Sequence, residues 1–242
     1  MDSTEEIAEK YLRSQGYESV VYEPDGNIPP DFLVDRRIAV EVRRLNQHDQ
    51  SERPRGLEET QIPLLQRMRK LLTTLGPPTT DQSWFVTYDF ERPLEKWPIL
   101  KQQIEAALTN SLLQPSVKRH YLVVNDRFRL AVMPASTVSS QKFVVGGYSD
   151  DDSGGWTLHE LQRNAQLCVD EKTKKVAAYQ NRYSEWWLLL ANYISYSISG
   201  LELELFDPRL AIPAPWSRVI FVNPLKPTLG LEFHPRGRPS NR

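Results

Sequence analysis

The chain has 242 residues, of which 40% are hydrophobic and 25% are charged, so it is long enough to bury a sizeable globular core. Its 30 basic and 31 acidic side chains nearly cancel, and the net charge therefore does not indicate a nucleic-acid partner. The single cysteine, Cys168, excludes an internal disulfide and cysteine-based zinc motifs.

The start of the sequence is polar and helical. Residues 2–15 carry many charges and an apolar stripe at helical spacing, without the apolar core of a signal peptide. The longest apolar run, residues 186–198, is interrupted by polar side chains and is too short to span a bilayer. We therefore expect a soluble cytoplasmic protein with no membrane partner.

Three strands are expected after this helix, because residues 17–23, 31–34 and 37–45 are rich in β-branched and aromatic side chains. A helix with a periodic leucine face is expected at residues 63–75, followed by a strand at 84–90. The elements expected beyond residue 90 are a helix from Pro98, strands at 120–125, 128–133 and 143–145, a helix from Thr157, a buried strand or helix at 185–194, and a strand at 218–223.

Two acidic residues stand in these apolar, strand-like segments. Asp31 opens the run Asp31–Val34, and Glu41 lies in the middle of the run Ile38–Leu45. A carboxylate in such a segment is costly to bury unless a cation, a metal ion or several hydrogen-bond donors receive it. A hairpin would bring Asp31 and Glu41 side by side, and two converging carboxylates can bind a hard divalent ion.

The order of these elements and residues resembles the PD-(D/E)XK nuclease superfamily. In that family an acidic residue on a first helix precedes a three-stranded meander, Pro-Asp opens the second strand, Glu-x-Lys stands in the third, and a helix and a strand follow. The matching residues here are Glu6, Pro30-Asp31 and Glu41-Val42-Arg43, within about the first third of the chain. The departure is Arg43 in the lysine position, because arginine stays protonated at any accessible pH and cannot act as a base.

The resemblance implies an α/β fold (mixed α+β) with a restriction-endonuclease-like core, in which helices flank a central mixed sheet. It implies one nuclease-like domain over residues 1–223, with a core of 2–90 and 156–223 and a β-rich embellishment inserted at 91–155. The Pro-, Gly- and Arg-rich segment 224–242 is expected to be a flexible basic tail.

The activity that the resemblance implies is metal-dependent hydrolysis of phosphodiester bonds in nucleic acid, with DNA expected ahead of RNA. The cofactor would be Mg²⁺ or Mn²⁺. Its ligands would be Asp31, Glu41 and the carbonyl of Val42, and Glu6 would hold the ion through water.

The catalytic lysine has two candidate replacements. The superfamily relocates its lysine to other elements, so Lys172 or Lys175, on the helix that begins at Thr157, would supply what Arg43 cannot. A relocated lysine, or Arg43 itself, would orient the attacking water or stabilise charge in the transition state. Lys172 falls on the apolar stripe of its helix. From this position its long side chain can extend to solvent, or its ammonium group can reach the carboxylates, and both interpretations stay open.

Structural roles are the alternatives for both carboxylates. Asp31 suits a turn after proline, and Glu41 suits an ion pair with a nearby arginine or with Lys172 in a buried network. The competing functional hypothesis is a catalytically inactive nuclease-like module that binds nucleic acid or a protein partner. A homodimer is compatible with either hypothesis. The basic residues within 36–70 would line a phosphate-binding face or form an ordinary solvated surface.

Overall fold

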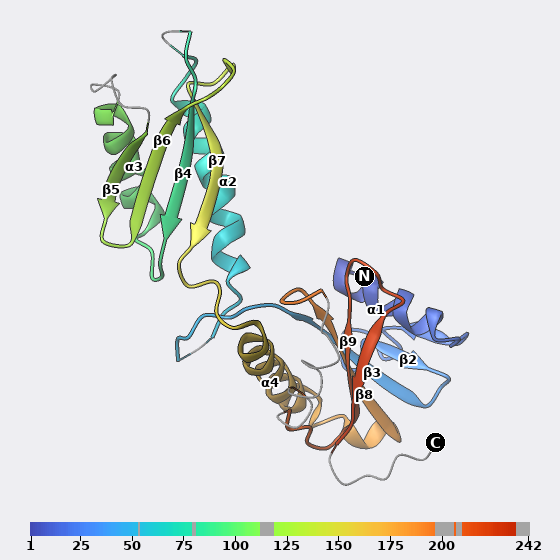
Figure 1. Ribbon diagram of the computed structural model, residues 1–242. Helices are drawn as coiled ribbons and strands as arrows, with labels where there is room; N and C mark the ends of the chain where they lie inside the picture. The colour runs from blue at the N-terminus through green and yellow to red at the C-terminus, as the bar shows by residue number, and fades with distance from the viewer. Residues whose placement is uncertain (53, 79–80, 112–118, 197–205, 207–209, 236–242) are drawn as a thin grey trace. The chain divides into compact units, whose positions relative to one another are not determined.

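The computed structural model of the chain describes residues 1–52, 54–78, 81–111, 119–196, 206 and 210–235 (Figure 1). The chain folds into two compact units: unit 1 comprises Met1–His48 and Gly155–Arg242, and unit 2 comprises Asp49–Gly154. The fold is mixed α/β, with two mixed sheets and four α-helices among the described residues. Each of these helices is too short or too polar to serve as a membrane span.

Unit 1 is built on a six-stranded sheet in the order β1-β2-β3-β8-β9-β10. The strands are β1 (Val20–Tyr22), β2 (Phe32–Val34), β3 (Ile38–Leu45), β8 (Glu185–Asn192), β9 (Trp216–Val222) and β10 (Gly230–Phe233). β1, β2 and β3 form an antiparallel meander, and β10 is antiparallel to β9 at the far edge. β3, β8 and β9 run parallel to one another. Parallel neighbours need a crossover connection, and α4 (Thr157–Val176) lies on the connection that leads into β8.

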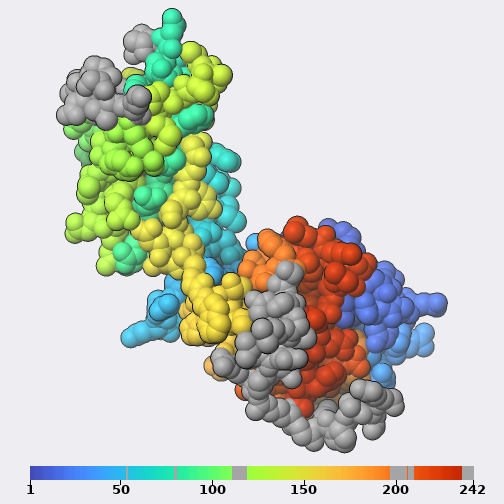
Figure 2. Space-filling view, viewed as in Figure 1, coloured from blue at the N-terminus to red at the C-terminus, as the bar shows by residue number. Residues whose placement is uncertain are grey.

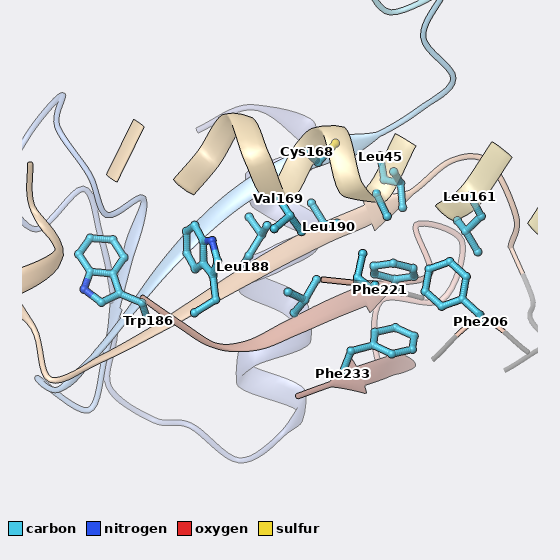
Figure 3. Packing of buried hydrophobic residues seen from close by; sticks show 14 of the residues in the cluster. Leu45, Leu161, Cys168, Val169, Trp186, Leu188, Leu190, Phe206, Phe221 and Phe233 are labelled. Atoms are coloured by element: carbon cyan, nitrogen blue, oxygen red, sulfur yellow. The ribbon is translucent and has the colours of Figure 1, made fainter. Parts of the chain in front are cut away.

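Two helices cover the two faces of this sheet (Figure 1). The apolar stripe of α1 (Ser3–Ser14) packs on one face, and α4 packs on the other. Figure 3 shows Val169 of α4 with Leu188 and Leu190 of β8 in the space between this helix and the sheet. Unit 1 therefore has three layers, with the sheet in the middle.

The alternation of side chains along β3 decides which face each residue serves. Val40 and Val42 belong to the core under α1, whereas Ala39 and Leu45 belong to the core under α4. Successive strand residues point to opposite faces, so Glu41 points toward α4. A carboxylate thus stands in an otherwise apolar layer between the sheet and the helix.

Local signals define the ends of α1. The Asp2 side chain accepts hydrogen bonds from the amides of Thr4 and Glu5, and the Glu5 side chain accepts one from the amide of Asp2. This capping box satisfies donors that the first turn leaves free. At the other end, Gly16 adopts a φ of +91°, a conformation that glycine reaches without strain.

Unit 2 contains a four-stranded sheet in the order β5-β6-β4-β7. Its strands are β4 (Trp84–Phe90), β5 (His120–Asn125), β6 (Phe128–Pro134) and β7 (Phe143–Asp150). α2 (Glu58–Thr74) and α3 (Trp97–Ser111) pack on one face, over a core that includes Tyr88 and Phe128. The other face exposes Tyr121 and Val123, and no helix of the described part of unit 2 covers it (Figures 1 and 2).

The division into two units corrects the predicted domain boundaries. The expected core comprised residues 2–90 and 156–223. In the structure its first part ends at His48 and its second part begins at Gly155, so the inserted part starts at Asp49 rather than at residue 91. The helix and strand that were expected to complete the core, α2 and β4, pack into the separate core of unit 2. The pair that completes the sheet of unit 1 is α4 and β8.

Two local predictions also change. α2 begins at Glu58 rather than at residue 63, because its polar first turn is helical but shows no apolar periodicity. The segment 224–242, expected to be a flexible tail, contains β10, and Phe233 of this strand packs against Phe221. Residues 236–242 of that segment lie outside the described residues. The sequence of segment 185–194 allows a strand or a helix, and residues 185–192 of it form the strand β8.

The substitution Leu188→Ala is expected to destabilise the protein by about 3 kcal/mol, because Leu188 is fully buried under α4 and its loss leaves a cavity. Leu225→Ala is the matched control, because the Leu225 side chain is 75% exposed. Urea denaturation followed by tryptophan fluorescence measures both changes. A loss at Leu188 no larger than the loss at Leu225 would contradict the packing of α4 on the sheet.

Candidate functional site

Asp31 and Glu41 lie opposite each other on neighbouring strands. β2 and β3 pair with Phe32 opposite Val40, and extending this antiparallel register by one residue sets Asp31 opposite Glu41. The Oδ2 atom of Asp31 accepts a hydrogen bond of 2.7 Å from the amide of Val42, the residue after Glu41. The hairpin therefore brings the two carboxylates side by side, as the sequence predicts.

This arrangement places two like charges in a poorly solvated layer. The side chain of Glu41 is 0% exposed. Burial, and next the charge of Glu41, raise the pKa of Asp31 from its ordinary value of 3.8 to about 6. Lys172, the amide of Val42 and Lys175 act in the opposite direction and limit the rise.

α4 supplies two ammonium groups to the same oxygen of Glu41. The Nζ atom of Lys172 lies 2.6 Å from Glu41 Oε1, and Lys175 Nζ also donates a hydrogen bond to Oε1. The two lysines are three residues apart, so they lie on one face of the helix. The Lys172 side chain is 9% exposed, whereas that of Lys175 is 45% exposed. Burial by itself lowers the pKa of Lys175, but the hydrogen bond and the charge of Glu41 outweigh burial and raise this pKa.

The second carboxylate oxygen of Glu41, Oε2, is buried and has no hydrogen-bond partner. A buried acceptor without a partner is costly, so this oxygen is a natural point of attachment for a ligand. Oε2 and the Asp31 carboxylate are oxygen donors of the kind that Mg²⁺ and Mn²⁺ prefer. The donor set therefore fits a hard divalent ion.

The side chains of the described residues do not form a complete coordination shell for such an ion. The described part of the chain contains no group of three or more His, Cys, Asp or Glu residues placed to hold a metal ion. Mg²⁺ is commonly held by one or two carboxylates together with water and substrate phosphate. Two carboxylates therefore suffice for an ion that substrate and water help to bind.

Arg43 does not join the carboxylate pair. It lies on the same side of β3 as Glu41, but its Nη2 atom forms an ion pair of 3.0 Å with Oε2 of Glu171 on α4. Of the three cationic side chains that the sequence suggests for this site, Lys172 and Lys175 contact Glu41, whereas Arg43 pairs with Glu171. The sequence gives no signal for Glu171, because only the packing of α4 on β3 identifies it as the partner of Arg43.

The remaining predicted residues have different positions. Glu6 is exposed on α1, which covers the opposite face of the sheet from α4, so the structure does not bring it to the pair. Val42 approaches the pair through its amide, and the role of its carbonyl as a ligand stays a prediction. Cys168 is buried, and burial raises the pKa of its thiol to about 11. A protonated thiol is a poor nucleophile, so this environment suits a packing role for Cys168.

No protein-family model matches this chain, and it matches no curated protein and no solved structure either.

Asp31→Asn is expected to stabilise the metal-free protein at neutral pH. Because the pKa of Asp31 is higher in the folded than in the unfolded chain, ionisation of Asp31 weakens folding as the pH rises from about 4 through about 6. The amide retains an acceptor for Val42 without the charge, so the gain should reach about 1–3 kcal/mol above this range. Chemical denaturation with a chelator present, at about pH 7.5 and about pH 4, measures it. A gain that does not shrink at the lower pH would contradict this origin.

Proposed function

We propose that the chain is a metal-dependent nuclease of the PD-(D/E)XK kind that hydrolyses phosphodiester bonds of nucleic acid, with DNA as the expected substrate. The observation that carries the proposal is the convergence of Asp31, Glu41 and Lys172 from three elements, with one buried carboxylate oxygen lacking a partner. Phosphodiester hydrolysis needs an anionic site for a cation and a positioned donor beside it. These residues supply both.

The order of elements in unit 1 supports this proposal. α1 precedes the β1-β2-β3 meander, and α4 and β8 follow once unit 2 is treated as an insertion between β3 and α4. Asp31 stands immediately before the second strand and Glu41 within the third, which is the order that the resemblance implies. A restriction-endonuclease-like core for unit 1 is accordingly part of the proposal.

The residues of the site have separate roles in this mechanism. Asp31 and Oε2 of Glu41 would hold Mg²⁺ or Mn²⁺, which supplies compensation for the charge that develops on the phosphate. The buried side chain of Lys172 extends from α4 to Glu41, and this contact keeps its ammonium group at a defined position. From there it orients the attacking water and stabilises negative charge in the transition state. Arg43 is held away from this role by Glu171.

A catalytically inactive module that binds nucleic acid or a protein partner is the second candidate. One observation favours it: the formal charges of the two carboxylates are balanced by those of the two lysines that contact Glu41. Ammonium groups therefore already offset the repulsion between the carboxylates without a metal ion. Metal binding and cleavage separate the two candidates.

Calorimetric titration with Mg²⁺ and Mn²⁺ is expected to show binding to the wild-type protein and binding at least about tenfold weaker to Glu41→Gln and Asp31→Asn, because each variant removes a charged ligand. Circular dichroism checks that both variants are folded. A wild-type protein that binds neither ion, alone or with a DNA oligonucleotide present, would contradict the metal site.

Lys172→Met is expected to lower the rate of Mg²⁺-dependent cleavage of DNA at least about 100-fold, because methionine has a similar length but no donor and no charge. Lys174→Met, at an exposed neighbouring lysine, is the matched control and should cleave like the wild type. Gel assays on mixed single- and double-stranded DNA measure both rates. Equal rates in the two variants would show that Lys172 is not the catalytic lysine.

A further inference from the structure

The two lysines create a conflict for any ion that enters this site. Asp31 and Glu41 carry two formal negative charges, and Lys172 and Lys175 carry two positive charges. Adding a divalent ion while both ammonium groups remain leaves two uncompensated positive charges in a layer that is poorly solvated. Like charges repel most strongly where water is excluded. One ammonium group must therefore withdraw when the ion binds.

The surroundings of the two lysines decide which one withdraws. Lys172 lies in the buried stripe of α4 together with Cys168, Val169 and Val176, and its side chain is 9% exposed. Moving its ammonium group to solvent would disrupt this packing. Lys175 lies in the last turn of α4, and its side chain is 45% exposed. Rotations of its flexible stem are enough to carry its ammonium group into water.

The two oxygens of Glu41 point to the same division of roles. Oε1 accepts hydrogen bonds from both lysines, while Oε2 is buried with none. Departure of Lys175 would leave Lys172 on Oε1 and would not leave the carboxylate without a cation. It would also remove the more exposed of the two positive charges at the site.

We propose that Lys175 supplies the second positive charge that offsets the carboxylate pair in the free protein, and that it must leave Oε1 of Glu41 before a divalent ion binds at Oε2. This inference rests on the proposed function, because it concerns the same site and the same ion. Lys175 is then a positioning residue: it stabilises the carboxylate pair while the ion is absent and weakens the binding of the ion. Lys172 stays on Glu41 in both states.

The test compares Mn²⁺ binding by calorimetry in the wild-type protein, Lys175→Met and Lys174→Met. We expect Lys175→Met to bind Mn²⁺ about tenfold more tightly than the wild type, a coupling of the usual size between two interacting sites. Lys174 is exposed and adjacent in sequence, so Lys174→Met removes the same formal charge without removing a contact to Glu41. It should bind Mn²⁺ like the wild type. Adding Glu41→Gln to Lys175→Met should abolish the gain.

Three outcomes would overturn the inference. Equal binding by the wild type and Lys175→Met, lost in both with Glu41→Gln, would refute the role of Lys175 and leave the proposed metal site standing. An equal gain in Lys174→Met would show that only the net charge of the helix end matters. Absence of binding in both the wild type and Lys175→Met would refute the inference together with the metal site.

Discussion

A pair of like charges, one of them fully buried, is the constraint on which unit 1 depends. Asp31 and Glu41 face each other across the β2–β3 hairpin, on the side of the sheet whose other residues are mostly aliphatic and aromatic. Such a pair persists only if cations are held close to it, and Lys172 is held at 2.6 Å. The packing of α4 on β8 is therefore a condition for the site as well as for stability.

The sequence predicts those parts of the candidate site that depend on local signals. The apolar, strand-like residues around Asp31 and Glu41 are enough to place both carboxylates on one hairpin. The stripe of α4 places Lys172 on the apolar face of this helix, but it leaves open whether the ammonium group reaches solvent and does not identify the partner of Lys172. That contact joins residues 131 positions apart, and only the packing of α4 on β3 brings them together. For the same reason the sequence does not exclude Arg43 as a candidate, since its partner Glu171 belongs to the same distant helix.

The boundary between the two units is a feature that local sequence patterns cannot predict. The segment 63–90 and the segment 157–192 both contain a helix with an apolar stripe followed by an apolar strand. Either pair satisfies the expected order, and the choice depends on which apolar faces fit which core. In unit 2, α2 packs in the core that contains Tyr88 and Phe128, whereas in unit 1 α4 packs against Leu188 and Leu190. This complementarity is a property of whole surfaces and is not encoded in any short stretch of residues.

The position of unit 2 between β3 and α4 has a consequence for synthesis on the ribosome. While residues 49–154 are being made, the edge of β3 that later pairs with β8 has no strand beside it, and an unpaired apolar edge invites association with other chains. Domains usually fold in the order in which they emerge, but here the second unit is complete before the first. Nascent chains therefore carry the acidic pair without its lysines until α4 is made, and the candidate site is among the last features to form.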